Sequence, residues 1–123
     1  EVEAIAAYLK TLELPPPVGV LRGTSDAKAI ELGRVIFERH DCGSCHAAPS
    51  YTTPAVYNVG LRDSQGLKEF NPPSLRGLSH RGPYFHDSSA ATLSDVLVKF
   101  GHPIGTEIPP LDIADLVEFL NSL

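Results

Sequence analysis

The residues best suited to chemistry are the two cysteines, which lie in one short cluster, Cys42-Gly43-Ser44-Cys45-His46. The chain contains no other cysteine. Two thiols three positions apart can add to the two vinyl groups at one edge of a porphyrin, and the adjacent imidazole can ligate the iron. The spacing therefore predicts one covalent haem c, attached through Cys42 and Cys45, with His46 as an axial iron ligand.

Three other uses of such a cluster explain the sequence less well. A structural zinc site needs about four Cys or His ligands and usually a second paired cluster, which the sequence does not contain. A thioredoxin-type redox pair belongs near a βαβ pattern, and the chain shows none. A plain disulfide would leave His46 unexplained. Covalent haem attachment remains the preferred interpretation.

Composition supports a buried cofactor and excludes several partners. The 123 residues suffice for one domain, yet they include five Phe, four Tyr, no Trp and no Met beside 11 Pro and 10 Gly. A haem would supply the bulky apolar group that such a core lacks. The net charge of -5 argues against binding to nucleic acid or anionic lipid. No apolar run approaches the roughly 18 residues of a membrane span, so we expect no membrane insertion by this segment.

The elements before the cysteines can be predicted from periodicity and helix signals. Residues 1–12 show the apolar spacing of an amphipathic helix, and residues 14–24 have the Pro/Gly content of a linker. A second helix is expected to begin with Ser25 as its N-cap and to end near His40. Gly33 inside that helix suggests close approach of another element, because glycine costs about 1 kcal/mol there relative to alanine.

The elements after the cysteines are expected to be loops followed by two helices. Residues 47–91 are rich in Pro and Gly, and we expect no substantial sheet in them. Thr92-Leu93-Ser94-Asp95 has the pattern of a capping box that starts a short helix, which Gly101 ends. Asp112 is predicted to cap the last helix, whose apolar stripe comprises Ile113, Leu116, Val117, Phe119 and Leu120.

The two ends of the chain resemble each other. Residues 1–12 align without gaps on residues 112–123, so that Tyr8 meets Phe119 and Leu9 meets Leu120. This repeat predicts that residues 1–13 are the last helix of a preceding similar domain, joined by the linker 14–24 to a mono-haem domain over 25–123. The alternative is that two amphipathic helices of the same period converge by chance.

The order of these elements is similar to that of a class I cytochrome c. A helix leads into Cys-x-x-Cys-His, loops follow, and the C-terminal helix carries an aromatic residue in its apolar stripe. The resemblance implies an all-α fold, with three to five helices and long loops around a covalently bound haem. It also implies that the first and last helices of the domain cross closely, with Gly33 and Phe119 at the crossing.

A narrower resemblance lies in two segments, Asn71-Pro72-Pro73-Ser74-Leu75-Arg76-Gly77-Leu78 and Gly82-Pro83-Tyr84-Phe85-His86-Asp87-Ser88-Ser89-Ala90-Ala91-Thr92-Leu93. They resemble the C-terminal haem domain of bacterial di-haem cytochrome c peroxidases and of the related enzyme that matures methylamine dehydrogenase. The resemblance implies that Arg76 contacts a haem propionate, or else is a solvated surface arginine, and that Tyr84 lines the haem. Phe100 takes the place of the Met or Tyr ligand of those relatives and is expected to line the haem without ligating it.

The sixth iron ligand cannot be Met, because the chain has none. His102, two residues beyond Phe100 in a glycine-flanked loop, is the expected ligand. The alternatives are an open or water-bound iron, His80 or His86, and each of these histidines could instead be a surface residue. His40 immediately precedes the attachment motif and is expected to stay on the proximal side.

Ligation by two histidines would restrict the protein to electron transfer, at a lower potential than a His/Met cytochrome has. The alternative is a peroxidase-type or ligand-sensing haem domain with an open sixth position. The family resemblance implies a periplasmic or otherwise exported bacterial protein, of which this chain would be one module. Its expected partner is a redox protein or an adjacent haem domain of the same polypeptide.

Overall fold

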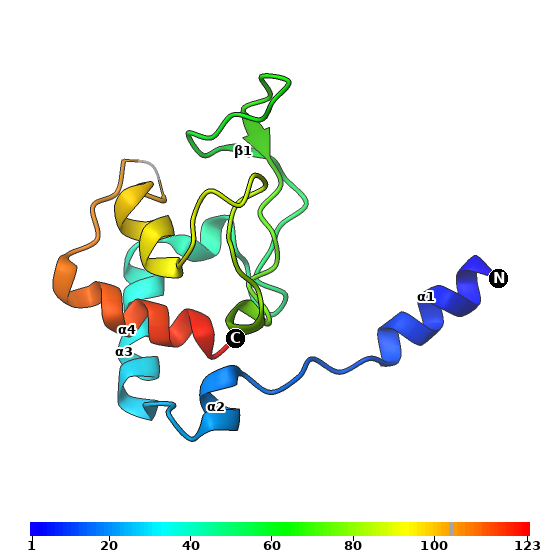
Figure 1. The fold of residues 1–123 in the computed structure, drawn as a ribbon, viewed down its shortest axis with the longest axis horizontal. Helices are drawn as coiled ribbons and strands as arrows, with labels where there is room; N and C mark the ends of the chain where they lie inside the picture. The colour runs from blue at the N-terminus through cyan, green and yellow to red at the C-terminus, as the bar shows by residue number, and fades with distance from the viewer. Residues whose placement is uncertain (104) are drawn as a thin grey trace.

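The structure, a computed structural model, describes residues 1–103 and 105–123. It is mostly helical (Figure 1). The α-helices are α1 (Val2–Thr11), α2 (Val18–Arg22), α3 (Ala27–Arg39) and α4 (Pro110–Asn121), and the other helical turns are η1 (Cys42–Ser44), η2 (Leu78–His80) and η3 (Asp95–Lys99). Strands β1 (Tyr57–Asn58) and β2 (Glu69–Phe70) form one antiparallel pair. The prediction of a cytochrome c-like, mostly α fold without a substantial sheet is confirmed.

The centre of the fold is the crossing of α3 and α4 (Figure 1). A Cβ atom at Gly33 would lie 2.0 Å from the carbonyl oxygen of Asp115 and 2.6 Å from the Cβ of Phe119, so only glycine fits there. The Phe37 and Phe119 rings meet edge to face with centroids 5.4 Å apart. The close approach predicted at Gly33 and Phe119 is confirmed. The buried core comprises Ile36, Phe37, Leu78, Leu93, Ile108, Leu116, Phe119 and Leu120.

Two of the predicted helix caps are wrong. The N-cap of α3 is Asp26, whose Oδ1 accepts hydrogen bonds from the backbone N–H groups of Lys28 (2.9 Å) and Ala29 (3.2 Å). Ser25 is therefore one residue outside the cap. Helix α4 begins at Pro110, which suits the first helical position because its missing N–H would have no partner there. Asp112 consequently lies inside the first turn and is not the cap.

The capping box before η3 is confirmed, although the helix that follows is wider than expected. The Thr92 N–H donates to Asp95 Oδ2 (2.9 Å), and the Asp95 N–H donates to Thr92 Oγ1 (3.0 Å). Residues Asp95–Lys99 form a π-helical turn, closed by the Phe100 N–H on the Asp95 carbonyl at 3.0 Å. Gly101 adopts a left-handed conformation (φ 59°) and ends the helix as predicted.

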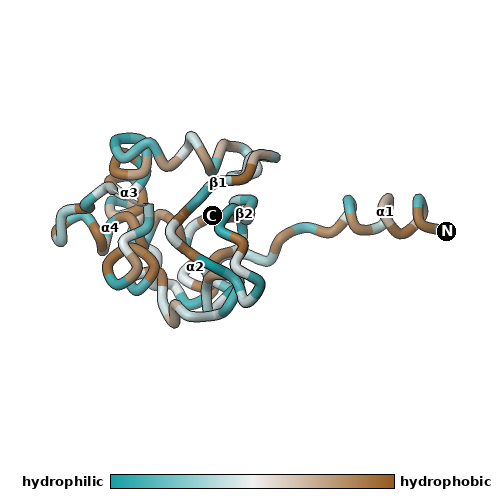
Figure 2. The backbone as a smooth tube through the Cα atoms, turned by 90° about the horizontal axis from the view of Figure 1, so that it is seen from above, coloured by the Kyte–Doolittle hydropathy of each residue, from teal (hydrophilic) through white to brown (hydrophobic). Residues whose placement is uncertain are grey.

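The N-terminal segment lies apart from the rest of the molecule (Figures 1 and 2). Helix α1 has the predicted bounds to within a residue at each end and buries none of its residues. Within the expected linker, the structure contains α2, whose Val18 N–H donates to Ser79 Oγ (3.1 Å). The linker therefore contacts the domain at Val18. The assignment of α1 to a preceding domain stays a prediction.

Candidate haem-binding site

The cysteine motif lies in a tight turn directly after α3. Asp41 takes a left-handed conformation (φ 52°), η1 follows, and the His46 N–H donates to the Cys42 carbonyl at 2.9 Å. Cys42 and Cys45 are half-buried free thiols. Burial raises the pKa of Cys42 to about 11, so this sulfur is a protonated thiol at neutral pH. Both sulfurs are available for attachment to one cofactor edge.

His46 is buried in a form suited to metal ligation. Its Nδ1 lies 3.2 Å from the carbonyl oxygen of Tyr51, which can accept the N–H of that nitrogen and leave the lone pair of Nε2 for a metal ion. Burial lowers the pKa of His46, and the backbone hydrogen bonds to Tyr51 and Pro73 oppose this only in part. The imidazole is therefore neutral at physiological pH, which is the state that binds metal.

His102 faces His46, although 56 positions separate the two residues in the sequence. The ring centroids are 6.4 Å apart and the ring planes are inclined at 72°. Burial lowers the pKa of His102, and the nearby His46 lowers it further, so both rings are neutral together. Nδ1 of His102 is buried and has no hydrogen-bond partner among the described residues. The structure thus brings the two predicted axial ligands together.

Phe85 lies between two rings, those of Phe100 and His102. Phe85 meets Phe100 edge to face at 5.2 Å between centroids and meets His102 at 6.2 Å. Phe100 and His102 thus share Phe85 as a neighbour, and a haem contact by Phe100 stays a prediction. Phe85 was missed as a site residue, although it belongs to the Pro-Tyr-Phe-His-Asp segment that was singled out in the sequence.

The other predicted cofactor contacts lie farther along the same loops. Arg76 is exposed, and its carbonyl accepts a hydrogen bond from Arg81 Nη2 at 2.5 Å. Tyr84 is half-buried against the core, and its hydroxyl donates to the Leu78 carbonyl at 3.2 Å. Burial raises the pKa of Tyr84, so it remains a neutral hydrogen-bond donor. A propionate contact by Arg76 and a haem contact by Tyr84 stay predictions.

The remaining histidines have other neighbours. His86 stacks on Phe70 with ring centroids 4.5 Å apart. Nε2 of His80 lies 2.8 Å from the carbonyl oxygen of Pro16, near the start of the linker 14–24. Within the described part of the chain, His102 is the histidine whose ring meets that of His46.

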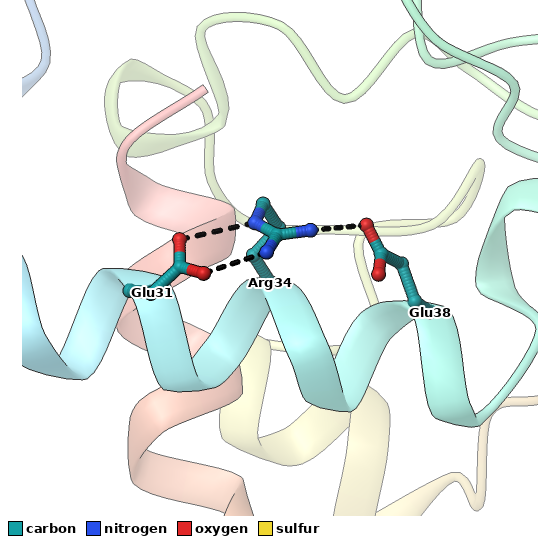
Figure 3. A network of polar contacts seen from close by, with 3 residues as sticks. All are labelled: Glu31, Arg34 and Glu38. Atoms are coloured by element: carbon teal, nitrogen blue, oxygen red, sulfur yellow. Dashed lines mark hydrogen bonds and ion pairs between the residues drawn. The ribbon is translucent and has the colours of Figure 1, made fainter.

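A cavity of about 410 Å³ lies on the Tyr51 side of His46. Its lining includes Phe37, His46, Tyr51 and Phe119, but neither cysteine and not His102, so it is separate from the space between the two imidazoles. Arg34 stands at its rim, donating from Nε to Glu31 Oε2 (3.0 Å), and also contacts Glu38 (Figure 3). Such exposed ion pairs fix the arginine at little gain in stability.

Two further properties bear on the site. No group of three or more His, Cys, Asp or Glu side chains that could hold a metal ion occurs in residues 1–103 and 105–123. Among the same residues, no helix has both the length and the apolar character needed to cross a membrane.

Comparison with known proteins agrees with the resemblance seen in the sequence. The chain is 27% identical over 146 aligned positions to cytochrome c peroxidase Ccp of Escherichia coli, covering 98% of this chain and 31% of that protein. It is 29% identical over 107 positions to the methylamine utilization protein MauG of Methylorubrum extorquens, covering 67% of this chain and 30% of MauG. Cytochrome c551 peroxidase of Pseudomonas aeruginosa is 27% identical over 145 positions, covering 98% and 42% of the two chains.

The chain spans less than half the length of these relatives. No protein-family model matches it. The relatives nevertheless agree with the free cysteine pair and the buried His46 in supporting a c-type haem domain. In sequence and in its mostly helical fold, the chain resembles the haem domains of cytochrome c peroxidases and MauG.

Proposed function

We propose that this chain is an electron-transfer domain in which Cys42 and Cys45 attach one haem c and His46 and His102 are its axial ligands. The observation that carries the proposal is the 6.4 Å separation of the two imidazole centroids. With metal–nitrogen bonds of about 2 Å, two imidazoles on opposite sides of one metal ion have ring centroids roughly 6 Å apart. The His46–His102 pair has the span that such ligation requires.

The chain's own residues would define what the site can do. Haem supplies one-electron redox chemistry, and the protein supplies burial, orientation and electrostatics. The Tyr51 carbonyl can accept the Nδ1–H of His46, and burial favours the neutral form of both His46 and His102. Two bound imidazoles leave no position for substrate, so such a domain exchanges electrons and nothing else. Its reduction potential is expected below that of a His/Met cytochrome, because Met raises the potential.

A second candidate function is a peroxidase-type or ligand-sensing haem domain with an open sixth position. The names of the relatives favour it, since two of those compared are called cytochrome c peroxidases. For this function His102 would have to lie away from the iron. The two candidates therefore differ in one measurable property, the coordination of the ferric protein.

The test is the spin state of the purified ferric holoprotein, by optical and electron paramagnetic resonance (EPR) spectroscopy, before and after addition of cyanide. The proposal expects a low-spin wild type that binds cyanide slowly and a high-spin His102→Ala variant that binds it readily. His80→Ala is the matched control and is expected to keep the wild-type spectrum, because His80 contacts Pro16 instead. A high-spin wild type that binds cyanide readily would overturn the proposal and support the second candidate.

We also propose that the chain is one module of a larger exported protein and that α1 belongs to the preceding module. The apolar residues of α1 support this, because Ile5, Tyr8 and Leu9 are each more than half exposed here. Their counterparts Leu116, Phe119 and Leu120 in α4 are buried against α3. The neighbouring haem domain or a separate redox protein would be the electron-transfer partner.

Leu9→Ser tests the assignment of α1. The substitution is expected to leave the unfolding midpoint of this chain unchanged and to lower that of the full-length protein. Equal midpoints for the substituted and unsubstituted full-length proteins would exclude a buried α1.

A further inference from the structure

Phe85 adopts a backbone conformation that is unusual for a bulky residue. Its φ is 68°, in the left-handed region that favours glycine. Such a conformation persists where the surrounding structure imposes it, and it occurs most often at functional sites. The conformation of Phe85 therefore needs a physical explanation.

The cause is the closure of the loop that contains Phe85. The Tyr84 N–H donates to the Ala90 carbonyl at 2.7 Å, and the Ala90 N–H returns a bond to Tyr84 at 3.4 Å. Within this closed loop, the Ser88 N–H donates to the Phe85 carbonyl at 3.3 Å. The Tyr84 hydroxyl anchors the loop to the Leu78 carbonyl. The loop thus holds the ring of Phe85 against Phe100 and His102.

The ring of His102 is held differently from that of His46. A metal-ligating histidine almost always donates its other ring N–H to a carbonyl, carboxylate or water, as His46 can to Tyr51. Nδ1 of His102 is buried without a partner among the described residues. The backbone of His102 is held by its N–H on the Val96 carbonyl (3.1 Å), but this bond leaves the ring free to turn. Packing must then orient the ring.

We propose that Phe85 is the positioning residue for the distal imidazole: held by its strained loop, it sets the orientation of the His102 ring and keeps that ring from swinging away. This inference rests on the proposed His46/His102 ligation. The orientation it maintains is the 72° inclination between the two imidazole planes. Steeply inclined axial imidazoles give a low-spin ferric EPR spectrum dominated by one broad low-field line, whereas parallel imidazoles give a resolved rhombic spectrum. The ring orientation is therefore directly measurable.

The test compares ferric holoprotein variants by EPR, by the rate of cyanide binding and by thermal unfolding. Phe85→Ala is expected to shift the low-field line toward a rhombic spectrum and to speed cyanide binding roughly two- to tenfold, the loss that one edge-to-face aromatic contact represents. Phe85→Tyr keeps the ring and is expected to restore both properties. Phe70→Ala, which removes the aromatic partner of His86, is the matched control and should leave both unchanged.

The possible results separate this inference from the proposed function. A Phe85→Ala protein that is less stable, yet keeps the wild-type EPR line and cyanide rate, would show that Phe85 is only structural and would overturn the inference. If Phe85→Ala does not fold, Phe85→Leu takes its place, because leucine retains bulk without an aromatic ring. It is compared with the wild type by the same EPR line and the same rate of cyanide binding. A high-spin wild type, or a His102→Ala variant that stays low-spin, would instead overturn the ligation itself.

Discussion

Replacing Gly33 by alanine is expected to weaken the whole domain, because Gly33 is the contact point of α3 and α4. The added Cβ would lie 2.0 Å from the Asp115 carbonyl oxygen, an atom that cannot move without shifting α4. Alanine gains about 1 kcal/mol in helix propensity. Overpacking a core costs about 3 kcal/mol at the upper end of its usual range, and this clash is severe. The expected net loss is about 2 kcal/mol.

Thermal unfolding of the holoprotein, followed by circular dichroism, measures this loss. For a domain of this size, about 2 kcal/mol corresponds to a fall in the unfolding midpoint of roughly 10 °C. Gly43→Ala is the matched control, since its Cβ would have only the Phe37 ring at 4.0 Å, an ordinary contact. A Gly33→Ala midpoint equal to that of wild type would refute the argument that α3 and α4 are in backbone contact at this point.

Three further predictions follow from the caps and the buried histidines. Thr92→Ala removes the hydroxyl that accepts the Asp95 N–H and is expected to lower the free energy of unfolding by about 1 kcal/mol in denaturant titrations. Asp112→Ala, which removes an ion pair with the exposed Arg39 and no cap, should cost less than about 1 kcal/mol in the same assay, and a larger loss would contradict its position inside α4. Because the pKa values of His46 and His102 are lowered from 6.5, the unfolded chain binds more protons than the folded protein below that pH. The free energy of unfolding should therefore fall as the pH drops below about 6.5. Equal denaturation midpoints at about pH 7 and pH 5 would contradict this expectation.

The sequence predicted the elements whose signals are local. The apolar stripe of α4, the capping box at Thr92 and the stop at Gly101 each depend on a few neighbouring residues, and each was found. The caps at Ser25 and Asp112 were wrong because several residues near each helix start can cap, and only the backbone geometry selects one.

Other features depend on tertiary structure, which periodicity does not report. Helix α2 was not predicted in its Pro/Gly-rich segment. The N–H of its first residue, Val18, has its hydrogen-bond partner in Ser79, a residue 61 positions away, which local sequence does not indicate. The role of Phe85 in the site was missed for a similar reason. Its contact with His102 depends on the loop that the Tyr84–Ala90 pairing closes. By contrast, the proximal half of the site lies within the five residues from Cys42 to His46 and could be recognised directly.

The large separation in sequence of His46 and His102 has a thermodynamic consequence for the middle of the chain. Between these residues the structure has only short helical turns and two strands of two residues each, so little regular hydrogen bonding organises this segment. Under the proposed ligation, a single iron would join positions 56 residues apart and act as a cross-link. As long as the histidine stays bound, closing a loop of that length raises the free energy of the unfolded chain by about 4 kcal/mol through lost entropy. Loss of His102 from the iron would remove this cross-link, so we expect it to loosen residues 47–101, about half of the domain.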